Sequence, residues 1–288
     1  MIQEITAKTL LSTVRADDRI FGLKYNFNIY RGCPHQCIYC DSRSECYGIA
    51  DFRDVQVKVN AVELLEHELA RKRIKGPIGT GSMSDPYNPI EQRYQLTRGA
   101  LQVVARHAFP LHLITKSDLV LRDLDLLAEI ARVHAAVCFT ITTTDDRLGK
   151  QIEPGAPLPS ARLAAMQALS EHGVPVGVTL MPVLPFITDD EDNIRGVVEQ
   201  AARHGGTFII PWFGMSMRDR QREWFYQELD RRFPGLRARY ERCYGTRYEC
   251  PTPNAARLRQ VCAQACAEHR LSDHIPYYQP LAVQPRLF

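Results

Sequence analysis

Three cysteines stand close together in a short polar segment, Arg-Gly-Cys-Pro-His-Gln-Cys-Ile-Tyr-Cys at residues 31–40. Cys33, Cys37 and Cys40 have the spacing C-x3-C-x2-C, and no fourth cysteine follows at a matching interval. Three thiolates can hold three irons of a cubane iron–sulfur cluster, whereas ferredoxins use a fourth cysteine for the last iron. A metal centre with one open coordination position is typical of catalysis rather than of structural support. The spacing therefore predicts a catalytic iron–sulfur site.

A zinc site is the main alternative for these thiols, with His35 or Cys46 as the fourth ligand. Zinc-binding C-x2-C pairs usually recur as two separated couples, which argues against this alternative. Packing of the thiols in an apolar core is a third interpretation. It conflicts with the composition, because Gly32, Pro34 and Gln36 make the segment a polar loop.

The cysteine segment resembles the radical S-adenosylmethionine (radical SAM) superfamily, in which an aromatic residue precedes the last cysteine as Tyr39 does here. The resemblance implies a four-iron four-sulfur (4Fe-4S) cluster whose unliganded iron chelates the methionine part of SAM. It also implies a reductant such as flavodoxin or ferredoxin, whose electron cleaves SAM and yields a 5′-deoxyadenosyl radical. The protein would position and shield these reactive groups.

Length and composition agree with a single barrel-type domain. The chain has 288 residues, 45% of them hydrophobic, and can bury one sizeable core. Nine cysteines are too few for a disulfide scaffold, and the first residues lack a charged segment followed by an apolar one. No stretch reaches the roughly 18 consecutive apolar residues of a membrane span. We expect a soluble protein of the reducing cytoplasm, with no membrane partner.

Short β-rich runs alternate with amphipathic helical patterns along the chain. Strands are expected at residues 25–30, 76–80, 111–115, 136–143, 174–181 and 207–212. Six β/α units favour a parallel sheet with helices outside it. Composition and periodicity do not distinguish an open doubly wound sheet from a barrel, but the resemblance implies a partial (β/α)6 TIM-type barrel. We expect this α/β barrel at residues 1–215 and a C-terminal helical extension at 216–288 that packs on it.

Local signals indicate where helices begin and end. Asn60 with Glu63 resembles a capping box at the start of a helix. Helix starts are also predicted at Asp123, Ser160 and Asp189, and helix ends at Gly173 and Gly205.

Polar residues follow several predicted strands, at the rim where α/β barrels place their active sites. Several of these segments resemble the spore photoproduct lyase-like branch, also called DNA repair photolyases: Ser-x-Ser-Asp-Pro-Tyr at 82–87, Ile-Thr-Lys-Ser-Asp at 114–118, Glu-Pro-Gly-Ala-Pro at 153–157 and Pro-x-x-Pro-x-x-Thr-Asp at 182–189. The resemblance implies that Ser84 and Lys116 contact polar groups of SAM, Thr142 its carboxylate or ribose region, and Tyr39 its adenine side. A fixed cation at Lys116 suits the carboxylate of SAM.

One position departs from this branch. Authentic spore photoproduct lyase carries a hydrogen-donating cysteine two residues before its Ser-Asp pair, and this chain has Ser82 there. A serine O–H bond is too strong to quench a carbon radical as a thiol does. The resemblance therefore does not carry over the dimer-repair reaction.

The segment 216–270 is basic, with 12 Arg against 7 acidic residues, a net charge of +5. It also contains the interleaved aromatic residues Trp224, Phe225, Tyr226, Tyr240, Tyr244 and Tyr248. Arginines interleaved with aromatics suit a nucleic-acid surface. A solvated helical face whose aromatics pack on the barrel explains the pattern equally well, because the overall pI of about 8.4 is only mildly basic.

Four further cysteines raise the question of an auxiliary cluster: Cys243, Cys250, Cys262 and Cys266. Cys262 and Cys266 are one helical turn apart, so core packing also explains them. Taken together, the sequence predicts a radical SAM enzyme of undetermined substrate. Repair or modification of a nucleic-acid base, and a non-catalytic iron–sulfur or zinc protein, are the alternatives.

Overall fold

A seven-stranded sheet forms the centre of the computed structural model, which describes residues 1–14, 20–49 and 51–280. Its strand order is β10-β9-β8-β7-β6-β3-β2, and all neighbours are parallel except β2 and β3. The strands are β2 (Ser12–Thr13), β3 (Tyr25–Asn26), β6 (Ile78–Thr80), β7 (Leu111–Thr115), β8 (Ala135–Thr140), β9 (Val176–Leu180) and β10 (Phe208–Pro211). Six parallel strands with helices on the outside confirm the predicted α/β class and partial (β/α)6 barrel.

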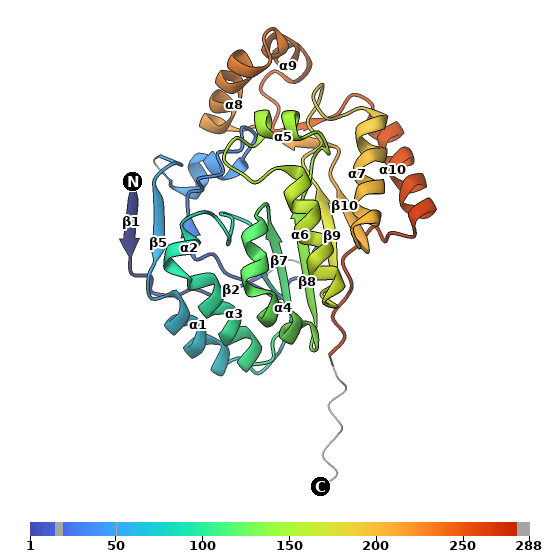
Figure 1. Ribbon diagram of the computed structural model, residues 1–288. Helices are drawn as coiled ribbons and strands as arrows, with labels where there is room; N and C mark the ends of the chain where they lie inside the picture. The colour runs from blue at the N-terminus through green and yellow to red at the C-terminus, as the bar shows by residue number, and fades with distance from the viewer. Residues whose placement is uncertain (15–19, 50, 281–288) are drawn as a thin grey trace.

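Helices cover the outer face of this sheet, as Figure 1 shows. They are α1 (Ala61–Ala70), α3 (Leu96–Arg106), α4 (Leu124–Ala131), α6 (Pro159–Glu171) and α7 (Glu191–Arg203). Shorter elements lie in the connecting segments: α2 (Glu91–Tyr94), α5 (Asp146–Ile152), η1 (Asp41–Arg43), η2 (Glu45–Tyr47) and η3 (Asp118–Asp123). Each of these outer helices follows a strand and brings the chain back to the edge of the sheet at which the next parallel strand begins.

The first predicted strand is much shorter than expected. It leaves the sheet after Asn26, and residues Tyr30–Arg31 form a separate strand, β4. Strand β4 pairs with β5 (Val55–Lys58), which also pairs with β1 (Ile2–Ile5) in a small three-stranded sheet. Local alternation of polar and apolar residues does not predict this pairing, because the partner residues are distant in the sequence. The sheet carries the cysteine segment away from the barrel wall and across its rim.

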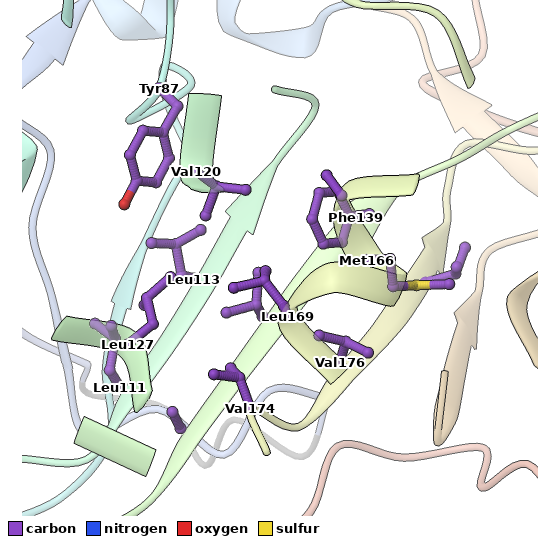
Figure 2. Packing of buried hydrophobic residues seen from close by; sticks show 14 of the residues in the cluster. Tyr87, Leu111, Leu113, Val120, Leu127, Phe139, Met166, Leu169, Val174 and Val176 are labelled. Carbon is purple, nitrogen blue, oxygen red and sulfur yellow. The ribbon is translucent and has the colours of Figure 1, made fainter. Parts of the chain in front are cut away.

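Buried side chains on both faces explain why the central strands are uniformly apolar. On β8, Val137 and Phe139 belong to the core beneath the helices, whereas Cys138 faces a second cluster with Phe208. Figure 2 shows Leu113 of β7 and Leu169 of α6 in the first of these clusters. The polar strand ends thus follow strands whose two faces are packed with apolar side chains.

The helix boundaries can be compared with the helix starts and ends that were predicted from the sequence. Asp123 precedes α4, and Gly173 and Gly205 follow α6 and α7 with positive φ, as predicted. The starts at Ser160 and Asp189 were off by one or two residues, since Pro159 begins α6 and Asp190 caps α7.

The predicted capping box at Asn60 was wrong. Asn60 precedes α1, but its side chain makes no cap. Its amide instead binds the backbone of Ala7, donating to the carbonyl at 2.9 Å and accepting from the N–H at 2.9 Å. The contact with the N-terminal segment therefore replaces the local hydrogen bond.

Three helices dominate the C-terminal part: α8 (Asp219–Arg232), α9 (Leu236–Tyr244) and α10 (Ala255–His269). Helix α10 packs beside α7, whereas α8 and α9 lie near α5 at the top of Figure 1. Strand β11 (Gly214–Ser216) pairs with β12 (Glu249–Pro251), so the expected boundary between 215 and 216 falls inside a strand. The two-part division stays a prediction, and residues 281–288 lie outside the described residues.

Among the described residues, no helix is both long enough and apolar enough to span a bilayer.

Candidate active site

The three cysteines line one cavity of about 110 Å³ at the carboxyl ends of β6, β7 and β8. Ser84, from the segment after β6, and Lys116, from the end of β7, line the same cavity. The cavity wall further includes His35, Ser42, Gly81, Ser82, Met83, Asp85, Ile114, Thr115 and Thr140. The structure therefore brings the cysteines together with two of the four residues predicted to contact SAM.

A buried contact between His35 and Asp85 fixes the cysteine loop to the strand ends. Nε2 of His35 lies 3.2 Å from Oδ2 of Asp85, and both side chains are almost fully buried. Nδ1 of His35 lies 3.1 Å from the Gly155 carbonyl oxygen. Asp85 also accepts hydrogen bonds from the Thr115 hydroxyl and the Lys116 N–H, each at 2.7 Å. One carboxylate thus connects the loop to β7.

The charge state of Asp85 follows from these contacts. Burial raises the pKa of Asp85, but the contacts with His35, Lys116 and Thr115 outweigh it and lower the pKa to about 2. The carboxylate is therefore ionised at any physiological pH and holds its donors in place.

Gly155 allows a second close approach to the loop. A Cβ atom at this position would lie 2.2 Å from the carbonyl oxygen of Pro34. The Gly155 N–H donates to the His35 carbonyl at 2.8 Å, and the Ile38 N–H donates to the Ile152 carbonyl at 2.9 Å. Backbone contacts thus hold the segment after α5 against the cysteine loop, and a side chain at residue 155 would separate them.

Tyr39 belongs to a buried polar network beneath the loop. Its hydroxyl donates to Oε1 of Glu153, and Oε2 of Glu153 pairs with the Arg162 guanidinium at 2.5 Å. Arg162 also donates to the carbonyls of Thr140 and Pro157. Burial raises the pKa of Glu153, but the positive charges of Arg162 and Lys116 lower it by more. The network keeps Glu153 ionised and orients the aromatic ring beside the last cysteine.

Ser84 and Lys116 are two further residues that were predicted to contact SAM, and each has its own contacts with the site. The Ser84 hydroxyl donates to the Gly32 carbonyl at 2.7 Å and so ties the segment after β6 to the loop. Lys116 is half-buried, with Nζ 5.8 Å from the centre of the Tyr39 ring. Burial lowers the pKa of Lys116, but the charges of Cys37 and Glu153 raise it by more. Lys116 therefore stays a cation at the cavity wall.

Thr142 lies after β8 and is not among the residues that line the cavity. Its side chain is buried, and its hydroxyl oxygen has no hydrogen-bond partner in the part of the chain that the structure describes. An unpaired buried hydroxyl is uncommon in native proteins and indicates a missing partner.

The cysteine thiols suit a cluster better than a single zinc ion. Within residues 1–14, 20–49 and 51–280, no three side chains of His, Cys, Asp or Glu converge on one metal position. Both ring nitrogens of His35 face protein oxygens, and Cys46 is exposed on η2. A cubane cluster places each cysteine on a different iron, so three spread thiolates around a cavity match it. Burial raises the pKa of the Cys33 thiol to about 12, a cost that bound iron would offset.

Four of the C-terminal aromatics pack on the cysteine loop, whereas Tyr248 is exposed. Phe225, Tyr226, Tyr240 and Tyr244 are buried in one cluster with Tyr39. Many of the arginines have protein partners: Arg218 with Asp41, Arg222 with three carbonyls, Arg231 and Arg232 with Glu228, Arg237 with Asp230 and Glu241, and Arg257 with Glu191. The packing interpretation of this segment is therefore favoured.

The four C-terminal cysteines do not form one group. Cys243 is exposed, Cys250 packs with the aromatics, and Cys262 and Cys266 belong to the main core. These four cysteines therefore lie in three different environments.

Several residues of the site had no role assigned from the sequence. His35, Asp85, Glu153 and Arg162 lie within or beside the motifs that resemble the photoproduct lyase branch, so the motifs were the available signal. Gln221 of α8, whose side chain donates to the Tyr39 carbonyl at 3.2 Å, had no such signal.

Comparison with known proteins assigns the family. Residues 27–196 match the radical SAM superfamily, and this match covers more than half of the chain. The chain therefore belongs to the radical SAM superfamily, which implies a 4Fe-4S cluster and SAM as cofactors.

The chain is also similar to curated proteins, one of which is named as a radical SAM enzyme. The chain is 34% identical over 283 residues to an uncharacterised protein of Mycobacterium tuberculosis, covering 95% of this chain and 82% of the relative. It is also 24% identical over 181 residues to the radical SAM Nalpha-GlyT isomerase of Pseudomonas phage M6, covering 63% of this chain and 37% of that protein.

Solved structures show the same fold. A spore photoproduct lyase complexed with dinucleoside spore photoproduct has a TM-score of 0.71 at 15% identity, covering 93% of this chain and 79% of that one. A variant of that lyase with AdoMet and the dinucleoside bound has a TM-score of 0.70 at 16% identity, covering 96% and 82%. The predicted resemblance to the photoproduct lyase-like branch is thus confirmed at the level of the fold.

We predict that Glu153→Gln destabilises the protein by about 3–5 kcal/mol, because it leaves the buried Arg162 cation without its counter-charge. Urea unfolding of the full chain measures this loss. Glu191→Gln is the matched control, since Glu191 pairs with Arg257 at the surface and exposed pairs contribute little. Equal stability of the two variants would contradict the role assigned to the network.

Gly155→Ala should cost about 1–3 kcal/mol, because its methyl group must push the backbone of Pro34 away. Gly196→Ala in α7 is the control. The nearest atom to its Cβ lies at 3.5 Å, and alanine favours a helix by up to about 1 kcal/mol. Thermal unfolding of both variants checks the difference, and a neutral Gly155→Ala would show that the contact is not tight.

Proposed function

We propose that this chain is a radical SAM enzyme that reductively cleaves S-adenosylmethionine at a 4Fe-4S cluster bound by Cys33, Cys37 and Cys40. The observation that supports this most directly is the meeting of the three thiols and a cationic lysine in one cavity at the strand ends. A metal-binding module without chemistry would not need that lysine. The family match supports the same cofactors.

When bound, the cluster and SAM would supply a 5′-deoxyadenosyl radical that abstracts a substrate hydrogen. The chain's own residues would bind and orient the cluster and SAM and shield them from water. Lys116 would hold the SAM carboxylate by a charge-assisted hydrogen bond. The Ser84 hydroxyl donates its hydrogen to the Gly32 carbonyl. Its oxygen therefore remains able to accept a hydrogen bond from a group in the cavity. The unpaired Thr142 hydroxyl is a further candidate for the carboxylate or ribose region, and the Tyr39 ring for the adenine side.

Covering elements would exclude water from this chemistry. Helix α8 contributes Gln221 to the Tyr39 carbonyl, and Ser216 donates to Asp41 at 2.8 Å. These contacts support a cover over the loop formed by α8 and the segment before it. An external one-electron donor such as flavodoxin or ferredoxin would reduce the cluster, and the reducing cytoplasm would preserve it.

Repair or modification of a nucleic-acid base is a second candidate function. The fold shared with spore photoproduct lyase favours it, since that lyase has been seen with a dinucleoside spore photoproduct. Ser82 lines the cavity where the lyase-like branch would need a thiol, so transfer of hydrogen from this position is chemically unfavourable. The residues present are compatible with a lyase reaction or a transferase reaction. A base-directed activity would proceed by a chemical route different from that of dimer repair.

We predict that replacing Cys33, Cys37 and Cys40 together by Ala abolishes both the bound iron and the formation of 5′-deoxyadenosine. Anaerobic reconstitution with SAM and dithionite, followed by iron analysis and mass spectrometry, measures both. The control replaces Cys262 and Cys266 by Ala, which removes buried thiols outside the site and should retain both properties. Full iron content in the triple variant would refute the ligand assignment.

Lys116→Met should weaken SAM binding by about 1.5–3 kcal/mol, because it removes a charge-assisted hydrogen bond and keeps most of the side-chain volume. Equilibrium binding of SAM to the reconstituted protein measures the loss, which corresponds to roughly tenfold or more in affinity. Lys150→Met, on the exposed end of α5, is the control. Unchanged affinity in Lys116→Met would remove this residue from the SAM site.

The base-directed candidate predicts binding of nucleic acid whose affinity falls steeply with salt. Titrations of the full chain with single-stranded DNA, duplex DNA and RNA at two ionic strengths measure it. Many of the C-terminal arginines already have protein partners, so a steep fall would require the basic residues that have none. An absence of binding at low salt would leave a small molecule, peptide or protein as the substrate.

A further inference from the structure

A buried arginine lies directly behind the cysteine loop. Arg43 ends η1, three residues after Cys40, and is only 8% exposed. The centre of its guanidinium lies 3.9 Å from the Trp224 ring centre and 4.6 Å from that of Phe52. The cation is thus held between two aromatic faces, one from α8 and one from the segment before β5.

The protein provides Arg43 with no carboxylate of its own. Among the described residues, no Asp or Glu oxygen lies within ion-pairing distance of it, and its Nε has no hydrogen-bond partner. Glu228 pairs with Arg231 and Arg232, and Asp51, which lines one pocket with Arg43, pairs with Arg53, whereas Glu223 of that pocket is exposed. A buried cation without a counter-charge is costly, so a native protein is expected to supply one.

The cysteines are the groups that can supply this charge. Burial lowers the pKa of Arg43, and the negative charges of Cys40, Cys37, Glu228 and Cys33, in that order, oppose the effect. Thiols become permanently negative when iron replaces their protons. The counter-charge of Arg43 is therefore present when the three thiolates hold metal.

Hydrogen bonds fix the cation relative to the loop. Arg43 donates to Oε1 of Gln36 at 2.6 Å, and the Gln36 amide donates to the Cys33 carbonyl at 2.8 Å. The Gln36 backbone has a φ of 53°, which turns the residue back toward the loop. From the other side, Arg220 of α8 donates to the Arg43 carbonyl at 3.0 Å. Two elements far apart in the sequence thus hold one charge in place.

We propose that Arg43 is a positioning residue for the cluster, and that its fixed positive charge raises the cluster's reduction potential. This inference rests on the proposed function. One electron passes from an external one-electron donor to the cluster, with no bond made or broken and no proton moved. Because the reduced cluster carries one more negative charge than the oxidised one, a nearby cation stabilises it preferentially.

The test is an EPR-monitored redox titration of the reconstituted full-length protein. Arg43→Gln removes the charge and should shift the midpoint to a more negative potential. We expect the ratio of reduced to oxidised cluster at a fixed potential to fall about tenfold, equivalent to about 59 mV for a one-electron couple. Arg43→Lys, which keeps the charge, should restore the wild-type midpoint. Arg53→Gln is the control, because Arg53 is an exposed arginine on the far side of Asp51.

A second pair of variants leaves Arg43 and the loop intact. Trp224→Glu places a carboxylate against the guanidinium, whereas Trp224→Gln removes the ring without adding charge. The Glu variant should have the more negative midpoint of the two. Equal midpoints in this pair, or an Arg43→Gln midpoint equal to wild type at equal iron content, would overturn the proposal.

The outcomes separate this inference from the proposed function. A wild-type protein that assembles no iron–sulfur cluster would refute the function itself. A wild-type cluster that cleaves SAM, combined with an unchanged midpoint in Arg43→Gln, would refute the role of Arg43 alone.

Discussion

The position of the cysteine loop depends on the buried contact between His35 and Asp85. A loop that contains Gly32 and Pro34 has little regular structure of its own, so tertiary contacts must define its shape. Asp85 provides them by joining His35 to the hydroxyl of Thr115 and the backbone of Lys116. The same carboxylate thereby places the loop over the ends of β6 and β7, where the cavity lies. Loss of this contact would release the thiols from the lysine beside them.

Buried charges around the loop form a consistent pattern. Glu153 and Asp85 are each matched by protein partners, whereas Lys116 and Arg43 face the cysteines from two sides. Among the described residues, neither cation has a carboxylate within ion-pairing distance, which suits a site that gains negative charge when it is loaded with thiolate-bound iron. The aromatic helices α8 and α9 bury this arrangement and connect it to the C-terminal part of the chain.

Local sequence predicted those features that depend on local physics. Strand β7 was predicted at residues 111–115 because its apolar run is bounded by turn signals, and the cysteine spacing indicated the site directly. The shortened β3 could not be predicted, since β4 pairs with residues some thirty positions away. Asn60 failed as a cap for the same reason, because Ala7 reaches its side chain.

Charge partners of the site depend on tertiary structure. Ser84 and Lys116 were placed at the cavity by their positions after strands, which is a topological rule. Arg43 and Gln221 were not identified, because their contacts link the loop to a helix about 180 residues later in the chain. The aromatic residues of α8 and α9 suggested a surface but form a core, since composition does not reveal which face of a helix is covered.

We propose that one iron of the cluster has no cysteine ligand and binds SAM. EPR spectra of the reduced wild-type cluster, recorded before and after SAM is added, test this proposal. SAM should change the EPR signal, because its amino and carboxylate groups would coordinate the open iron. A fully assembled cluster whose signal is identical with and without saturating SAM would show that no iron is open to SAM.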